Sequence, residues 1–149
     1  MPVNRDFSDL FSAFNAAQVR YLLVGGYAIA VHAEPRHTRD LDVWVEPTAE
    51  NSVRVFEALA AFGAPLQDVA PSDFARPGLI FQLGVPPNRI DVITGITGVS
   101  FTEAWEGRAQ TTYGGHAVPV IGRRELIQNK RATGRPQDAI DVELLEKHG

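Results

Sequence analysis

Residues 40–46 read Asp-Leu-Asp-Val-Trp-Val-Glu. Apolar side chains alternate with mostly acidic ones, and this period of two predicts a strand with one buried face. Asp40 and Asp42 lie on the same face of that strand, with roughly 6.5–7 Å between their Cα atoms. Aspartate is depleted in strands and costly to remove from water. The pair therefore indicates a binding site rather than a purely structural strand.

Two further features flank this strand in the sequence. Upstream, Gly25 and Gly26 end the apolar run 21–24, and glycine lets the backbone approach a ligand where a helix begins. Downstream, Asp91 lies inside a second strand-like run, 89–94. Three carboxylates in a small volume repel each other unless a cation is bound. The pattern predicts a site for a divalent metal and phosphate.

The rest of the chain predicts an α+β fold, in which helices flank a mixed central β-sheet. A loop over 34–38 and an irregular Pro-rich stretch over 64–77, with a short turn near Ser72-Asp73, separate the regular segments. We expect one domain over 1–149 with a C-terminal helical segment over about 123–147. The expected helices cover about 6–17, 27–33, 48–62, 101–106, 123–133 and 136–147, and the expected strands cover 21–24, 40–46, 79–83, 89–94, 111–113 and 117–121.

Composition narrows the function classes. The chain has 149 residues, 44% of them hydrophobic, which is enough for one core. A net charge of −4 argues against a general affinity for nucleic acid, and the absence of cysteine excludes disulfides and thiolate zinc sites. No segment resembles a signal peptide or a membrane span, so we expect a cytoplasmic protein without a membrane partner. Basic residues gather in two small clusters: Arg36, His37 and Arg39, and Arg123, Arg124, Lys130, Arg131 and Arg135.

The order of these motifs resembles a known family. The glycine pair, the pattern Arg36-x-Thr38-x-Asp40-x-Asp42 and a later strand with a single aspartate are similar to nucleotidyltransferases of the DNA polymerase beta superfamily. The segment 129–141 resembles the tail of small bacterial members, which include abortive-infection toxin-type and antibiotic nucleotidyltransferases. The resemblance covers about 20–141. It implies the nucleotidyltransferase fold and Mg²⁺-dependent transfer of a nucleoside monophosphate from an NTP such as ATP to a hydroxyl.

The resemblance also implies roles for single residues. Gly25 and Gly26 would hold the triphosphate through backbone amides. Asp40 and Asp42 would coordinate Mg²⁺, with two ions expected and Mn²⁺ as an alternative. Asp91 would help to bind the second ion and act as base toward the acceptor hydroxyl, in an in-line attack on the α-phosphate.

Other residues are implied as nucleotide contacts. These are Arg36, Thr38 and Arg39 in the loop before the aspartate pair, and Lys130 near the C-terminus. For the arginines an exposed loop position is an equal alternative, and for Lys130 the alternative is a surface lysine near a helix end. Tyr27 follows the glycines where many members of the family have serine, so a hydroxyl contact to phosphate is not expected there.

Structural explanations compete with several of these roles. Arg89 can pair with Asp91, and the glycine pair can be a packing turn. Trp44 shares the aspartate face and can stack on a base, although covering the sheet is the interpretation we prefer. Asp138 and Asp141 on the last helix are expected to be structural, with Arg135 as a partner; the histidines have no metal-ligand spacing.

The expected partners are an NTP and an unidentified hydroxyl acceptor. The acceptor classes are a small molecule such as an antibiotic, an RNA 3′ end, or a Ser, Thr or Tyr of a partner protein. An antitoxin or a second copy of the chain is a further candidate partner. Two rival functions remain: an inactive nucleotidyltransferase-like binding or antitoxin-like module, and a metal-dependent phosphohydrolase that uses the same carboxylates with water as nucleophile.

Overall fold

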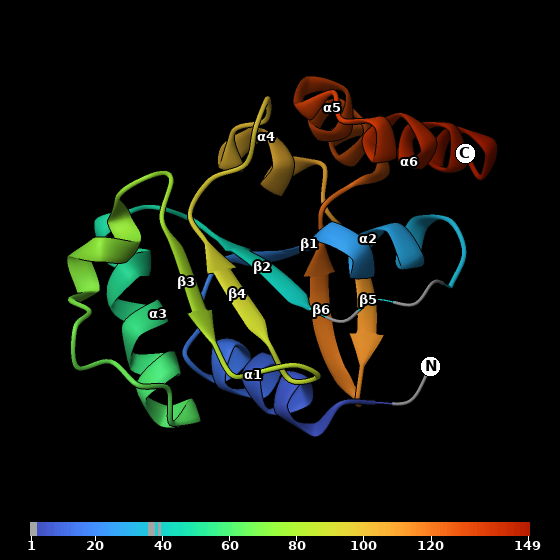
Figure 1. Cartoon of the computed structure of the whole chain (residues 1–149). Coiled ribbons are helices and arrows are strands. Elements are labelled where there is room, and N and C mark those ends of the chain that lie inside the picture. Colours follow the sequence, from blue (N-terminus) through green and yellow to red (C-terminus); the bar gives the residue numbers. More distant parts are fainter. Residues whose placement is uncertain (1–2, 36–37, 39) are drawn as a thin grey trace.

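The computed structural model describes residues 3–35, 38 and 40–149, and its centre is a six-stranded sheet. The strand order is β3-β4-β2-β1-β6-β5 (Figure 1). This mixed sheet with helices around it confirms the expected α+β class. The strands are β1 Tyr21–Val24, β2 Leu41–Val45, β3 Ile80–Leu83, β4 Ile90–Ile93, β5 Ala109–Tyr113 and β6 His116–Val120.

The sheet combines parallel and antiparallel pairs, and β2 is one of its two central strands. β2 is antiparallel to β1 and parallel to β4, while β1 is parallel to β6. The two outer pairs, β3 with β4 and β5 with β6, are antiparallel. Because β2 has a neighbour on each side, residues from the ends of β1 and β4 lie beside its acidic end.

The helices fall into two groups. α1 contacts α3, whereas α2 contacts α5 and α6, which lie together beside one end of the sheet (Figure 1). None of the helices in the described part of the chain has both the length and the apolar character that crossing a membrane requires. The helices are α1 Arg5–Ala16, α2 Gly25–His32, α3 Ala49–Phe62, the 3₁₀ helix η1 Pro71–Ala75, α4 Phe101–Glu106, α5 Arg123–Thr133 and α6 Pro136–Lys147.

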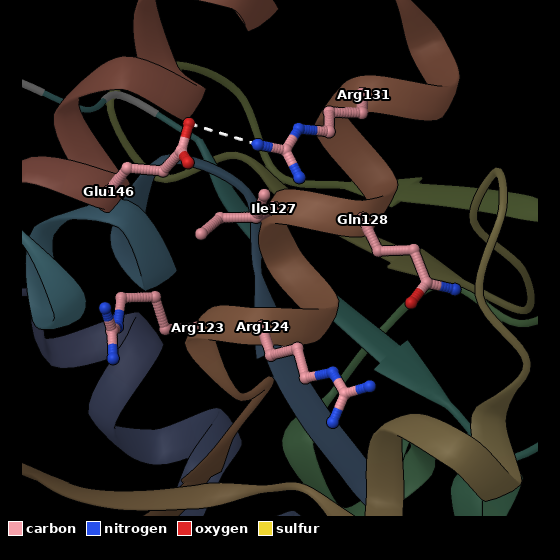
Figure 2. A pocket seen from close by; sticks show the side chains of 6 residues that line it. All are labelled: Arg123, Arg124, Ile127, Gln128, Arg131 and Glu146. Carbon is pink, nitrogen blue, oxygen red and sulfur yellow. Dashed lines mark ion pairs between the residues drawn. The ribbon is translucent and has the colours of Figure 1, made fainter. Parts of the chain in front are cut away.

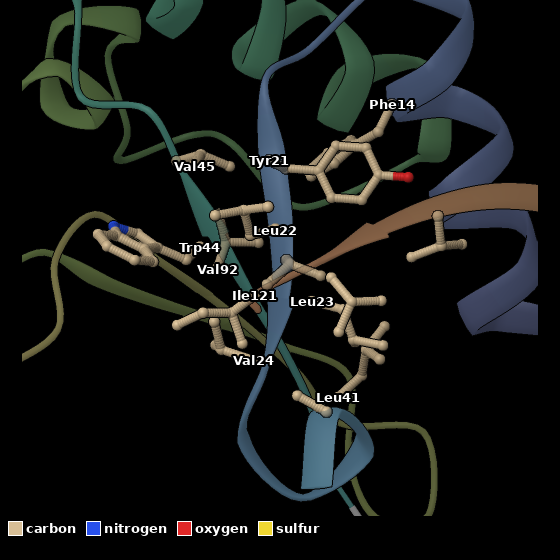
Figure 3. Packing of buried hydrophobic residues seen from close by; sticks show 14 of the residues in the cluster. Phe14, Tyr21, Leu22, Leu23, Val24, Leu41, Trp44, Val45, Val92 and Ile121 are labelled. Carbon is tan, nitrogen blue, oxygen red and sulfur yellow. The ribbon is translucent and has the colours of Figure 1, made fainter. Parts of the chain in front are cut away.

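The core is built around the central strands, and the helices from α1 to α6 all contribute buried side chains to it. α1 contributes a buried face of Phe7, Leu10, Phe11 and Phe14, as its helical spacing predicts. Figure 3 shows Leu22 and Trp44 on one face of the central strands, and Tyr21 beside Phe14 on the other.

Trp44 is one of the largest fully buried side chains, with 1% of its surface exposed. Its ring meets that of Phe101 edge to face, with 5.1 Å between the ring centroids. The indole is therefore enclosed by the protein and does not offer a face to a base. The preferred interpretation, a tryptophan that covers the sheet, is confirmed.

Asn51 joins α3 to the two central strands. Its side chain is 2% exposed, and its Oδ1 accepts a hydrogen bond from the backbone N–H of Arg20 at 2.8 Å. Its Nδ2 donates to the carbonyls of Arg20 and Glu46, both at 3.0 Å. Three backbone groups just outside β1 and β2 are thus bonded to one buried amide, and one of them, the Arg20 carbonyl, also accepts a hydrogen bond from the Glu46 N–H at 3.1 Å.

Replacing Asn51 with alanine should lower the free energy of unfolding by about 2 kcal/mol or more, because buried backbone groups lose their partners. Urea denaturation monitored by circular dichroism measures the change. Arg54→Ala, at an exposed position of the same helix, is the control and should stay within about 0.5 kcal/mol of the original chain. A loss for Asn51→Ala as small as that of the control would contradict the assignment.

Candidate active site

The sheet brings two distant acids side by side. Asp42 of β2 is the register partner of Asp91 on the parallel strand β4, and of Val24 on the other side, at the end of β1. The charge of Asp91 and hydrogen bonding to its side chain both help to raise the pKa of Asp42, so the two carboxyl groups lie close together. Asp42 therefore lies between the predicted base and the residue that precedes the glycine pair.

The surroundings of Asp42 disfavour its negative charge. Burial, followed by the charges of Asp91 and Asp40, raises the pKa of Asp42 to about 7, while the positive charge of Lys130 acts in the opposite direction. A bound cation would reverse this penalty. The donors are oxygens only, and two carboxylates together with phosphate and water are enough for Mg²⁺. The residues present thus fit a divalent metal.

Arg89 links Asp40 to this pair. Its Nε lies 3.2 Å from Asp91 Oδ1 and 3.9 Å from Asp40 Oδ2. Within the described residues, no group of three or more acidic or histidine side chains has the geometry to hold a metal ion. The structure therefore brings Asp42 and Asp91 into contact and holds Asp40 beside them through a shared arginine, so that Asp40 must turn from Arg89 to complete a set of three ligands.

The glycine pair touches the acidic residues directly. Gly25 has φ +71°, a conformation that favours glycine, and a Cβ atom at this position would overlap Asp42 Oδ2. A Cβ atom on Gly26 would lie 2.8 Å from Thr38 Cγ2. These residues open α2, whose N-cap, Val24, makes no side-chain capping bond. Amide groups of the first turn are thus available next to Asp42, where an anion would be stabilised.

Thr38 is the described member of the predicted loop contacts. Its hydroxyl Oγ1 is buried and has no hydrogen-bond partner in the described structure, an arrangement that is rare for a buried polar group. Arg36 and Arg39 lie outside the described residues. All three remain predicted nucleotide contacts.

Gly25, Asp42, Asp91 and Arg89 face an open cleft of about 810 Å³. The sheet ends form one wall, and α5 with the turn that follows it forms the other. No lining residue comes from the β5–β6 hairpin. The lining residues are Val24, Gly25, Asp42, Ile80, Gln82, Arg89, Asp91, Ile93, Ile96, Thr97, Asn129, Lys130, Ala132, Thr133 and Arg135.

Lys130 belongs to the cleft rather than to the outer surface. Its side chain is 12% exposed, and its Nζ lies 3.6 Å from Asp138 Oδ1. The lysine thus stands between a buried carboxylate of α6 and the Asp42 carboxylate, whose pKa it lowers. Lys130 lies in the last turn of α5, as the alternative of a surface lysine near a helix end has it, but most of its side chain is buried. Contact with a nucleotide remains a prediction.

The cleft is also lined by residues that were not among the sequence-predicted site residues, and these include Arg89, Asn129 and Arg135. Arg89 directly precedes β4 and lies two positions before Asp91, so the period of two already placed both on one face of the predicted strand 89–94. Asn129 donates a hydrogen bond to the carbonyl of Thr97 at 2.9 Å and joins α5 to the loop after β4. Arg135 follows the end of α5, and only the fold of the helical pair directs it toward the cleft.

A second cavity, of about 410 Å³, lies between α5 and α6 (Figure 2). Arg131 pairs there with Glu146 at 3.1 Å. The cavity includes none of the predicted site residues, and we assign it no part in the chemistry of the carboxylates. Its lining residues are Arg123, Arg124, Ile127, Gln128, Arg131 and Glu146.

Comparison with known proteins defines the fold. No family model and no curated protein matches the sequence. Among solved structures, the fold is that of nucleotidyltransferases.

Three of these structures illustrate the likeness. A candidate nucleotidyltransferase from Thermotoga maritima has 12% identity and a TM-score of 0.66, over 97% of this chain and 92% of its own. The lincosamide antibiotic adenylyltransferase LnuA with bound lincomycin has 15% identity and a TM-score of 0.58, over the whole of both chains. ANT(2″)-Ia in complex with adenylyl-2″-tobramycin has 14% identity and a TM-score of 0.61, over 95% of this chain and 86% of its own.

Proposed function

We propose that this protein is a metal-dependent nucleotidyltransferase that transfers a nucleoside monophosphate from an NTP to a hydroxyl acceptor. One observation carries the proposal: Asp42 lies between Asp91 and the end of β1, and Gly25 packs directly on its carboxylate. A paired carboxylate and a glycine-opened helix face the same cleft. The fold shared with nucleotidyltransferases supports the same class of reaction.

Each part of the cleft has a role in this proposal. Gly25 and Gly26 present amide groups to the triphosphate, and Lys130 meets its negative charge from the opposite wall. Asp40, Asp42 and Asp91 would hold Mg²⁺, one or two ions, which when bound offset the charge on the phosphate oxygens. Asp91 accepts the proton of the acceptor hydroxyl. The hydroxyl oxygen bonds to the α-phosphorus, the bond to the β-phosphate oxygen breaks, and pyrophosphate leaves with the electron pair.

The acceptor is the open part of the proposal. LnuA is described with lincomycin, and ANT(2″)-Ia with adenylylated tobramycin. A hydroxyl-bearing small molecule is therefore the first acceptor class to test, with RNA ends and protein hydroxyls next. An antitoxin and a second copy of the chain are further candidate partners.

Incubation with α-labelled and γ-labelled ATP, CTP, GTP and UTP in the presence of Mg²⁺ tests the function. We expect α-label on an acceptor from a panel of aminoglycosides, lincosamides, RNA and protein, with release of pyrophosphate. Release of inorganic phosphate alone would favour a phosphohydrolase. Nucleotide binding without any turnover would favour an inactive binding module.

Chelation should abolish the reaction, and added Mg²⁺ or Mn²⁺ should restore it. A readout that does not depend on turnover is the melting temperature, which should rise with millimolar cation because binding stabilises the folded state. Calorimetry of the chain with and without EDTA measures the shift. If EDTA changed neither the activity nor the melting temperature, this result would contradict a metal-dependent mechanism.

A further inference from the structure

The turn between α5 and α6 surrounds one buried carboxylate. Asp138, in the first turn of α6, is 1% exposed. Its Oδ2 accepts hydrogen bonds from Thr133 Oγ1, from the backbone N–H of Arg135 at 3.1 Å and from Arg135 Nε at 2.9 Å. Its Oδ1 accepts from Arg135 Nη2 at 3.1 Å and lies 3.6 Å from Lys130 Nζ. Both oxygens of this acid are thus occupied.

A buried charge is tolerated only when it is paired and hydrogen-bonded. The bonds from Arg135 and Thr133 hold the pKa of Asp138 well below its usual range, so the carboxylate is ionised near neutral pH. Arg135 binds it in a two-pronged contact, the geometry in which an arginine is most restricted. The side chain of Lys130, which is otherwise a flexible four-carbon stem, is held by the same acid.

Both cations that Asp138 holds, and Thr133 as well, line the cleft opposite Asp42. Asp138 itself is not part of the lining. We propose that Asp138 is a positioning residue, which fixes the ammonium of Lys130 and the guanidinium of Arg135 as a preformed site for the polyphosphate chain of the nucleotide. The inference rests on the proposed function for the identity of the ligand. The inference adds that Asp138, which does not contact the substrate, holds the two cations of one cleft wall in place.

The test separates phosphate binding from turnover. Binding of inorganic triphosphate, and of ATP with a non-hydrolysable α–β bridge, is measured by calorimetry for the original chain and for Asp138→Asn. We expect at least a tenfold loss of affinity for both ligands. With an acceptor in hand, KM for the NTP should rise at least tenfold while kcat changes less than about threefold. Asp138→Glu should recover part of the affinity.

Asp73 supplies a matched control. It also caps a turn, through the backbone N–H of Ala70, and pairs with an arginine three residues away, Arg76, at 2.7 Å. Neither residue of that pair lines the cleft. Asp73→Asn should leave triphosphate affinity unchanged, so any general effect of losing a capping acid is separated from the loss of the site.

Lys130→Gln completes a double-mutant cycle. It should weaken triphosphate binding at least fivefold. The fold-loss of affinity in the double variant should be clearly smaller than the product of the fold-losses in the two single variants. Full independence of the two effects, or unchanged affinity in a folded Asp138→Asn chain, would overturn the proposal. If Asp138→Asn does not fold, unchanged affinity in Lys130→Gln would overturn it instead. Triphosphate binding that depends on Asp138 without any nucleotidyl transfer would uphold the positioning role and reject the proposed enzyme function.

Discussion

Replacing Asp42 with asparagine should lower nucleotidyl transfer by about a hundredfold or more, equivalent to ~3 kcal/mol of transition-state stabilisation. Asparagine keeps the shape of the side chain but removes the charge that a metal needs. Since Asp42 is the acid in contact with both Asp91 and the glycine turn, no neighbouring carboxylate occupies the same place. Steady-state rates at saturating NTP and Mg²⁺ measure the loss.

The same substitution should not destabilise the fold. Burial and neighbouring acids raise the pKa of Asp42 to about 7 in the folded chain, whereas the unfolded chain has the ordinary value near 3.8. Between these values the folded state binds more protons, so the contribution of Asp42 to stability falls as the pH rises. At pH 8, Asp42→Asn should therefore melt at the same or a higher temperature in the absence of metal.

Glu46→Gln is the matched control for Asp42→Asn. Glu46 follows the other end of β2 and pairs with Arg20 at 3.6 Å, away from the cleft. Its loss should leave the rate unchanged. Full activity of Asp42→Asn, or an equal loss in Glu46→Gln, would contradict the assignment of Asp42 to the reaction.

Replacing Gly25 with alanine should impair both stability and activity. The left-handed backbone costs alanine about 1–2 kcal/mol, and the new methyl group must also displace the Asp42 carboxylate. A misplacement of about 1 Å near reacting groups can cost a hundredfold in rate. Urea denaturation and kinetics, each corrected for the folded fraction, measure the two effects.

Gly115→Ala isolates the cost of the backbone. Gly115 has φ +83°, similar to Gly25, but a Cβ atom there would meet nothing within 4 Å. This variant should lose about 1–2 kcal/mol of stability and keep its activity. If Gly25→Ala is no less stable than Gly115→Ala and equally active, the close packing of the turn on Asp42 has no functional role.

Local pattern was enough to predict most of the elements. The alternation in residues 40–46 predicted the strand that is β2, and the spacing of phenylalanines from Phe7 to Phe14 predicted the helix that is α1. Small differences arise where glycine or polar residues obscure the pattern. α2 begins at Gly25 rather than at Tyr27, and β5 begins at Ala109, two residues before the predicted start.

The pairing between strands could not be predicted from the local sequence pattern. Nothing in the sequence around Asp42 or Asp91 specifies that β2 and β4 are parallel neighbours in register, since a long segment with α3 and β3 separates them. The sequence pattern and the resemblance to a family implied a role for Asp91 together with Asp42, and the parallel pairing of β2 with β4 shows how the two acids come to lie side by side. The role of Arg89 between Asp40 and Asp91 also depended on three-dimensional proximity.

For the C-terminal segment, too, some features could be predicted from the sequence and others could not. Its helices and the structural pairing of Arg135 with Asp138 followed from the sequence. The contact of Asp138 with Lys130, which holds the lysine at the cleft, could not be predicted from the sequence, because it depends on how α5 packs over the end of the sheet.

A crystal structure with Mn²⁺ and ATP with a non-hydrolysable α–β bridge tests the central claim most directly. The anomalous signal of manganese should lie at metal-ligand distance from Asp42 and Asp91, with Asp40 turned away from Arg89 to join them and the phosphates against the amides of Gly25 and Gly26. Manganese or triphosphate bound in another part of the molecule, such as the arginine-lined cavity between α5 and α6, with the cleft at Asp42 left empty, would contradict it.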